Sequence, residues 1–356
     1  MSRLELILDN DGGADDRAPI HGELRPPSSG DFDFVIIADR TGGAVYTMFE
    51  KGLEVAKALR PEFILSIGDL VEGYWTDNAE ADAEWDQIDG LLDKLGIPVL
   101  LTPGNHDYGT QTMVDVWHRR KGADYYAVRY GPILILVANS EAGANFEGAV
   151  PDAVARWNRY NIKHPRQHTA IADFVKLGAA AAAEKYSDLF DRDGVYIDGA
   201  WADPNDSAFI EAFDRQLAAS EQFRDPRNLI NPALCQAQLT FFERVLAMHQ
   251  DVGWTFLSLH QPAWKVPDER FERMEALLSD RPYTVVAGHT HLLDVEVRRG
   301  RQYASLGKTG GLHCFEGAGD IHHVVLVRVR NGEPELEVVS YEDGIERLPL
   351  RDFVLR

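Results

Sequence analysis

Short apolar runs alternate with helical patterns along most of the chain. Residues 34–38 and 63–67 are continuous apolar runs, which are typical of strands buried on both faces. Between them, residues 45–59 have a helical pattern that stops before Pro61. Apolar residues at helical spacing within 77–95 predict the next helix, with one face turned to the core.

The same alternation continues toward the C-terminus. Further strands are expected at residues 98–102, 133–137, 254–259 and 283–287, and further helices at 233–250 and 268–279. The last part is richer in strands, at residues 302–306, 322–329 and 335–340. Alternating strands and helices followed by a strand-rich end indicate an α/β fold with a largely buried sheet.

Two stretches interrupt this rhythm. Residues 1–31 are rich in Asp, Gly, Pro and Ser, so we expect an acidic, flexible N-terminal arm before one domain over 32–356. Residues 145–232 contain an alanine run, helical patterns near 168–190 and 206–223, and proline-rich joints. We interpret this stretch as a mostly helical insertion that covers one edge of the core.

The charge balance narrows the classes of partner. The formal net charge is -21, so we expect no general binding to DNA or RNA and none to anionic membranes. The first residues are a poor secretory signal, and the longest strongly apolar run, 133–138, is far too short to cross a bilayer. Two cysteines, Cys235 and Cys314, are too few for a disulfide framework, and free thiols are expected. These features favour a cytoplasmic protein.

Residues with metal-binding or acid–base side chains follow five of the expected strands. In chain order they are Asp39, Gly68-Asp69, Gly104-Asn105-His106-Asp107, His260 and Gly288-His289-Thr290-His291. Each alone has an ordinary explanation as a turn or a helix cap, but an ordered set at five strand ends is poorly explained by chance. Ligand sites in open α/β sheets lie beyond the carboxyl ends of strands. Carboxylate and amide oxygens combined with imidazoles suit Mn, Fe or Zn better than Ca or Mg.

This ordered set resembles the calcineurin-like metallophosphoesterase superfamily, over about residues 33–340 with 145–232 as a divergent insertion. The resemblance implies a four-layer αββα sandwich, in which two mixed sheets are flanked by helices. It also implies two divalent metal ions at the strand ends, for which we expect Mn, with Fe or Zn as alternatives. Two such ions clamp an in-line phosphoryl displacement and activate a water molecule as the nucleophile.

The resemblance also implies a role for each matching residue. Asp69 would bridge the two metals; Asn105, His260 and His289 would complete one shell, and Asp39 and His291 would bind the other ion. His106 would act as the general acid on the leaving oxygen or bind a phosphate oxygen. Glu72, three residues after the bridging Asp, would orient the His106 imidazole and raise its pKa.

One position departs from the family pattern. The first motif is usually Asp-x-His, whereas this chain has Asp39-Arg40-Thr41. Because a protonated hydroxyl is a poor ligand, the first metal needs an added ligand, is held weakly, or is absent. Tyr74 is expected to pack in the loop or to contact the substrate, with a role as a phenolate ligand as the alternative.

Other residues near these motifs keep two interpretations. Arg40 is expected to grip phosphate bidentately or to form a surface salt bridge. For Lys308 and His313 the same two interpretations apply, phosphate binding or a surface salt bridge. His322 and His323 begin a strand and therefore point to opposite faces, so no third metal is expected there. His164 and His168 lie in the insertion and would reach the site only if it folds over as a lid.

The sequence thus predicts a metal-dependent phosphohydrolase that acts on a small phosphomonoester or phosphodiester. Its alternative, prompted by Thr41, is a degenerate, non-catalytic protein of the same fold that binds a ligand or partner. His106, Glu72 and Asp107 favour catalysis, because a pure binding scaffold does not need them.

Overall fold

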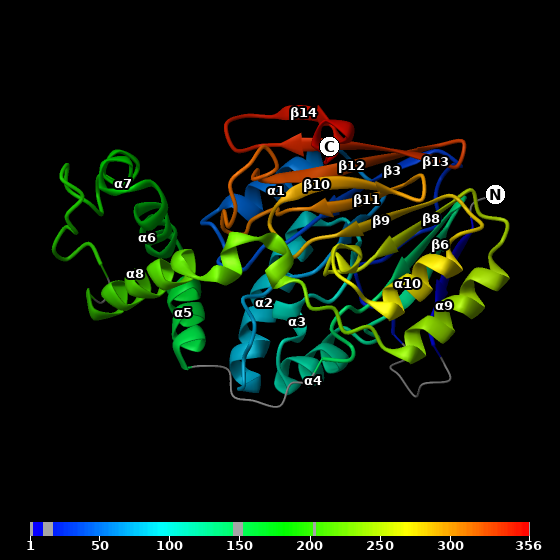
Figure 1. The fold of residues 1–356 in the computed structure, drawn as a ribbon, viewed down its shortest axis with the longest axis horizontal. Helices are drawn as coiled ribbons and strands as arrows, with labels where there is room; N and C mark the ends of the chain where they lie inside the picture. Colours follow the sequence, from blue (N-terminus) through cyan, green and yellow to red (C-terminus); the bar gives the residue numbers. More distant parts are fainter. Residues whose placement is uncertain (1–2, 10–16, 145–151, 202–203, 356) are drawn as a thin grey trace.

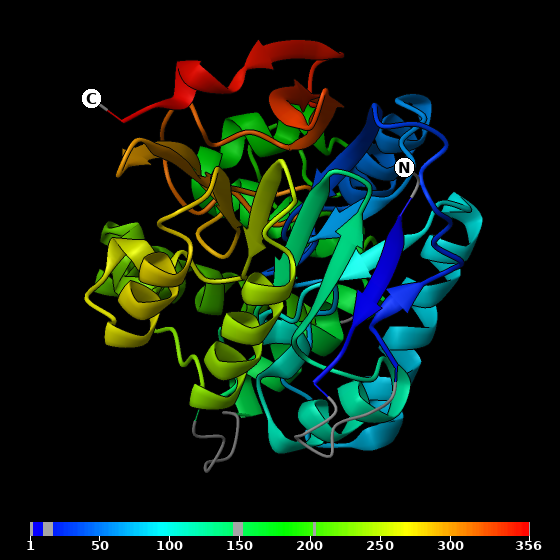
Figure 2. The ribbon, with the colours of Figure 1, turned by 90° about the vertical axis from the view of Figure 1, so that its right-hand side faces the viewer.

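The computed structural model describes residues 3–9, 17–144, 152–201 and 204–355. Its strands form two seven-stranded mixed sheets (Figures 1 and 2). One sheet has the order β1-β6-β7-β8-β9-β11-β10, and the other has the order β14-β13-β12-β3-β4-β5-β2. The expected sandwich of two mixed sheets is therefore confirmed.

The strands that carry the site motifs run parallel in each sheet. In the second sheet these are β3 (Phe32–Ile37), β4 (Ile64–Ser66) and β5 (Val99–Leu101). In the first they are β7 (Ile133–Val137), β8 (Trp254–Ser258), β9 (Tyr283–Ala287) and β11 (Arg301–Leu306). Parallel strands end at one edge of their sheet, so the loops that follow them gather at that edge.

The remaining strands are antiparallel to their neighbours. The C-terminal ones are β12 (His323–Arg330), β13 (Glu333–Ser340) and β14 (Glu346–Pro349). The sequence pattern missed β6 (Tyr126–Tyr130) and β10 (Leu293–Arg298). β10 includes charged residues, and β6 is buried throughout although it contains Arg129, whose guanidinium pairs with Asp251.

Three hydrophobic clusters lie between the four layers. The central one joins the two sheets and includes Phe34, Phe63 and Phe256. A second joins the β3–β5 sheet to the helices α1 (Met48–Ala58), α2 (Asn78–Leu95) and α4 (Gln111–Arg120). A third joins the other sheet to α9 (Gln236–Met248) and α10 (Glu269–Leu277). Apolar runs buried on both faces therefore become the inner layers, as the pattern predicted.

The N-terminal segment is not a flexible arm where the structure describes it. Strand β1 (Leu4–Ile7) pairs with β6, and β2 (Ile20–His21) pairs with β5. Both lie at sheet edges, where a short strand gains backbone hydrogen bonds on one side even in a polar sequence. Residues 1–2 and 10–16 of the expected arm lie outside the described residues.

The insertion is helical and has its own core. It contains α5 (Asp152–Lys163), α6 (Pro165–Leu177), α7 (Ala179–Lys185) and α8 (Pro204–Ala219), followed by the 3-10 turns η1 (Glu221–Arg224) and η2 (Pro226–Leu229). Trp157, Tyr160, Phe190 and Trp201 are buried together there. These helices form a lobe beside the sandwich (Figure 1). Residues 145–151 and 202–203 of the expected insertion lie outside the described residues.

Candidate metal centre

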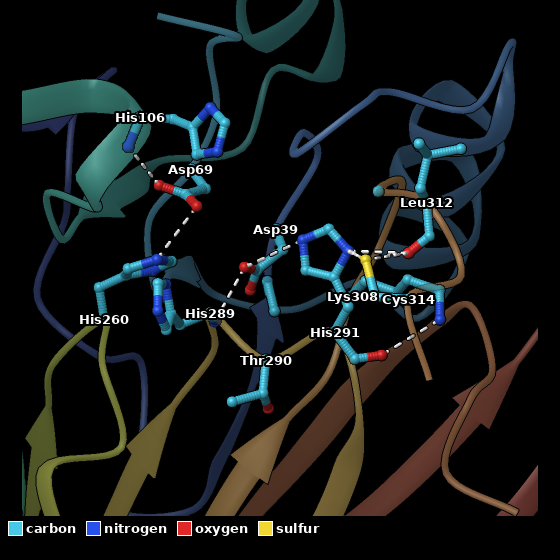
Figure 3. A network of polar contacts seen from close by, with 12 residues as sticks. Asp39, Asp69, His106, His260, His289, Thr290, His291, Lys308, Leu312 and Cys314 are labelled. Carbon is cyan, nitrogen blue, oxygen red and sulfur yellow. Dashed lines mark hydrogen bonds and ion pairs between the residues drawn. The ribbon is translucent and has the colours of Figure 1, made fainter. Parts of the chain in front are cut away.

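The six expected metal ligands follow five strands and lie together, as Figure 3 shows for all of them except Asn105. Asp39 follows β3, Asp69 follows β4, and Asn105 begins the short helix α3 (Asn105–Tyr108) after β5. His260 follows β8, and His289 and His291 follow β9. Asp39, Asp69, His260 and His291 are buried.

The backbone at these positions is locally demanding. Asp39, Asp69, His289 and His291 all have positive φ, which is uncommon for residues other than glycine. The adjacent glycines admit the carboxylates, because a Cβ on Gly104 would lie 2.2 Å from Asp69 Oδ1 and one on Gly288 would lie 2.1 Å from Asp39 Oδ2. The Gly-Asn and Gly-His pairs are therefore required by close packing around the two acids.

The hydrogen bonds of the three ligand histidines assign their ring nitrogens. His260 Nδ1 lies 2.8 Å from the carbonyl oxygen of Ile67, His289 Nε2 lies 2.8 Å from that of Leu229, and His291 Nδ1 lies 2.8 Å from that of Leu312. A carbonyl only accepts, so each of these nitrogens carries the hydrogen. The other nitrogen of each neutral ring then presents a lone pair to the centre.

These lone pairs face oxygen atoms that also only accept. His260 Nε2 lies 3.1 Å from Asp69 Oδ2 and 3.0 Å from Asn105 Oδ1, and His289 Nδ1 lies 2.7 Å from the same amide oxygen. Asn105 is oriented by Tyr74, whose hydroxyl accepts from Nδ2 at 2.6 Å. Converging acceptor atoms need a proton or a cation among them, and this set of oxygen and imidazole ligands suits a divalent transition metal.

The second half of the centre lies around Asp39. His291 Nε2 is 3.7 Å from Asp39 Oδ1, and the buried Asp39 Oδ2 has no hydrogen-bond partner among the described residues. A buried carboxylate oxygen without a partner is costly unless a cation is nearby. The residues present thus fit an ion at each half of the centre.

The pKa values of the ligand side chains indicate how the centre is protonated when no metal is bound. Burial lowers the pKa of His260, but the Asp69 carboxylate outweighs this effect and raises it to about 10. Burial and the charge of His260 lower the pKa of His289 to about 4. Burial and nearby Lys308 lower the pKa of His291 to about 3. Burial also raises the pKa of Asp39 well above its ordinary value. A proton on His260 therefore takes the place of a cation, while two rings stay neutral.

His106 lies beside the ligands, as expected, but Glu72 does not contact it through its carboxylate. His106 Nδ1 lies 2.7 Å from the backbone carbonyl of Glu72. The Glu72 carboxylate accepts from the backbone of Gly43 and Ala44 and from Asn161 Nδ2. The predicted carboxylate–imidazole pair is thus corrected: the main chain orients the ring, because the side chain is turned toward the insertion.

Asp107 and Glu84 organise the loops that carry these residues. The Asp107 carboxylate accepts backbone hydrogen bonds from Asp69, Leu70, Val71 and Gly104. Glu84 of α2 accepts from the backbone of Glu72 and Gly73 and from the indole of Trp75. Two buried carboxylates thus fix successive parts of the Asp69–Trp75 loop.

Arg40 is directed away from the centre. Its guanidinium donates to the carbonyl of Leu70 at 3.0 Å and lies 3.7 Å from the buried Glu84 carboxylate. Of its two predicted roles, the geometry matches the salt bridge, although the pair is mostly buried rather than at the surface. Thr41 is buried, and its hydroxyl has no partner among the described residues.

A cavity of about 780 Å³ opens over the centre. Its inner end is lined by Asp69, Asn105, His106, His289 and His291. Its outer wall comes from α6, α8 and η1 of the insertion, and from the loop 312–316. His168 is not part of the wall: it is fully buried against Trp157 at a ring-centroid distance of 4.6 Å.

Two residues that sequence reasoning missed also line the cavity, Glu141 and Gln261. Glu141 is buried and accepts from Ser140 Oγ at 2.9 Å and from Gln261 Nε2 at 2.8 Å. Burial raises its pKa, against the opposing charge of His260. The signal was present, because Glu141 follows the apolar strand 133–137 as the metal ligands follow theirs.

The structure also settles smaller points. Both cysteines are free and partly buried, as expected. Burial and the Asp69 carboxylate raise the pKa of Tyr74, and its hydroxyl accepts from Asn105 Nδ2, a contact that matches the predicted packing role. No helix within the described ranges is both long and apolar enough to span a membrane.

Solved structures of other proteins resemble this chain at low sequence identity. PhoD shares the fold, with 10% identity and a TM-score of 0.55 over 92% of this chain and 70% of that chain. A dimetal phosphatase from Danio rerio is 15% identical, with a TM-score of 0.47 over 90% of this chain and 99% of that chain. GAP50 of Plasmodium is 11% identical, with a TM-score of 0.46 over 90% of this chain and 88% of that chain. A search of curated proteins finds no match.

A family model for calcineurin-like phosphoesterases matches residues 34–305, which is most of the chain. The match includes all six ligand positions and His106. The family implies divalent metal ions in a dinuclear site, and the donor set described above fits them. This chain belongs to the calcineurin-like phosphoesterase family and is a hydrolase of phosphate esters.

Proposed function

We propose that this protein hydrolyses a small phosphomonoester or phosphodiester at a dinuclear centre. Asp69 would bridge the ions, Asn105, His260 and His289 would hold one, and Asp39 and His291 would hold the other. The observation that carries the proposal is the orientation of the three ligand histidines, each tied to a backbone carbonyl by its outer nitrogen. Such outer contacts fix the tautomer and the direction of a metal-binding imidazole.

The ions, when bound, supply positive charge for the transferring phosphoryl group and lower the pKa of water. The chain's own residues provide position and a proton. His106 lies in the cavity with Nδ1 held by the carbonyl of Glu72, so its Nε2 is the nitrogen free to act. We assign Nε2 of the protonated ring as the general acid for the leaving oxygen.

Two features support a small substrate. The cavity is walled by the insertion, which leaves a volume typical of small-molecule sites. The net charge of -21 disfavours a nucleic-acid substrate. We favour Mn as the resident metal, with Fe or Zn as alternatives, because the donors mix oxygen and imidazole nitrogen.

A substrate panel tests the proposal. Metal-free protein is supplied with Mn, Fe or Zn, and hydrolysis of p-nitrophenyl phosphate and bis-p-nitrophenyl phosphate is measured beside the Asn105→Ala and Asp39→Asn variants. We expect turnover with at least one ester. The Asn105→Ala variant should lose this turnover and should also lose about one bound ion per chain. If Asp39→Asn loses neither an ion nor activity, the Asp39 half is vestigial. Normal metal binding with no turnover on any ester would favour the non-catalytic alternative that Thr41 suggests.

A further inference from the structure

A second cluster of metal-binding side chains lies in the same cavity, outside the dinuclear centre. His313 is in the loop after β11, His322 immediately precedes β12, and Glu342 follows β13. One ligand atom from each lies within 4.8 Å of the others. The His322 side chain is fully buried, and those of His313 and Glu342 are 27% and 26% exposed. All three line the cavity.

The outer nitrogen of each ring is held by an acceptor. His313 Nδ1 lies 2.8 Å from Asp320 Oδ1, and His322 Nε2 lies 2.9 Å from the carbonyl oxygen of Gly311. These nitrogens therefore carry the hydrogens of the neutral rings. The inner nitrogens, His313 Nε2 and His322 Nδ1, both contact Glu342 Oε1, the former at 2.9 Å. When both rings are neutral, two lone pairs thus face one carboxylate oxygen, a contact that either a proton on one ring or a bound cation relieves.

The surrounding charges leave Glu342 as the anion of the cluster. Asp320 pairs with the ammonium group of the buried Lys308 and with that of Lys176, the latter at 3.3 Å. Asp320 also orients His313, which gives the carboxylate–histidine arrangement found behind metal-bound imidazoles. The adjacent His323 is not part of the cluster: its Nδ1 contacts the carbonyl of Ile321 at 3.0 Å.

We propose that His313, His322 and Glu342 bind a third divalent transition-metal ion of the Zn²⁺ class. Two imidazole nitrogens and one carboxylate oxygen form a donor set that Zn²⁺ takes with a fourth position open. The cavity beside the cluster leaves room for that fourth position.

The third site is joined to the dinuclear centre by two consecutive carbonyls. Gly311 accepts from His322 Nε2, and Leu312 accepts from His291 Nδ1. An ion at the third site would therefore stiffen the loop that orients a dinuclear-site ligand. His291 would keep its direction better when both clusters are filled.

Metal counting tests the proposal. Protein stripped with a chelator is dialysed against excess Zn²⁺, freed of unbound metal and assayed for ions per chain. His313→Ala and Glu342→Gln alter partly exposed side chains, so both variants are expected to fold, which circular dichroism checks. Each should hold about one ion fewer than the unchanged protein. His164→Ala, which removes an imidazole of the insertion, is the matched control.

Co²⁺ gives a second readout that does not depend on activity. A four-coordinate site with two imidazoles adds visible absorption on Co²⁺ loading, and we expect this component to decrease in both variants. Equal metal counts and equal Co²⁺ spectra in the unchanged protein and the two variants would overturn the proposal. An equal loss in His164→Ala would overturn it as well, because the effect would not belong to the cluster.

Discussion

His106 Nδ1 lies 2.7 Å from the backbone carbonyl oxygen of Glu72, while the Glu72 carboxylate is bound to Gly43, Ala44 and Asn161. One residue therefore orients the candidate acid with its main chain and secures the insertion with its side chain. The position of the His106 ring thus depends on the backbone of the loop after Asp69, which Asp107 and Glu84 hold in place.

Replacing His106 by Asn tests its role as the acid. We expect turnover to fall by about 10²- to 10⁴-fold, because proton transfer to the leaving oxygen is lost. Metal content should not change, since His106 is not among the ligands. The loss should be smallest for esters whose leaving group needs no proton, such as p-nitrophenol, so a loss equal across leaving groups would contradict the role.

Glu72→Gln separates a structural from an electronic role. Three N–H groups point at the Glu72 carboxylate, and an amide accepts through one oxygen only, so we expect a free energy of unfolding lower by about 1–3 kcal/mol. The pH profile of turnover should keep its shape, because the carboxylate does not contact His106. Asn161→Ala, which removes one donor, should show a smaller loss of stability. A displaced pH profile in Glu72→Gln would restore the predicted pair.

Arg40→Ala should affect stability more than substrate binding. Without the guanidinium, the buried Glu84 loses its cation, and burial already raises the pKa of that carboxyl. We expect a loss of about 1–3 kcal/mol, measured by denaturant unfolding, and an unchanged KM. A tenfold or larger rise in KM with unchanged stability would instead assign Arg40 to phosphate binding.

Asp214 of α8 should make stability depend on pH. Burial raises its pKa to about 7, against the hydrogen bond from the Trp157 indole. The folded state holds the Asp214 proton more tightly than the unfolded state does. The contribution of this proton to the free energy of unfolding is therefore present below about pH 4 and is lost as pH rises toward 7. Asp214→Asn keeps an acceptor for Trp157 and should not show this loss.

Thermal unfolding at pH 5 and pH 8 measures the difference. The free energy of unfolding of Asp214→Asn, relative to that of the unchanged protein, should be higher at pH 8 than below pH 4 by roughly 2–4 kcal/mol. Part of this difference should already be present at pH 5. Asp193→Asn, at an exposed carboxylate, should show no such dependence. A gain independent of pH would mean that Asp214 does not titrate in this range.

The sequence by itself determined the layers and most of the residues that meet at the candidate metal centre. Apolar runs such as residues 133–137 are buried on both faces, so their place in an inner layer, between the other sheet and the helices, follows from the pattern of apolar positions. The ordered motifs at the strand ends were enough to identify the ligand types, because parallel strands bring their carboxyl ends to one edge of a sheet.

Only the tertiary structure decided which atoms of those residues meet. Glu72 and Arg40 were assigned to the site by their position in the chain, but packing turned their side chains toward Asn161 and Glu84. The edge strands β1 and β2 and the cluster of His313, His322 and Glu342 depend on partners far away in the chain. Local patterns set hydrophobic faces, whereas such contacts arise only when distant segments are brought together.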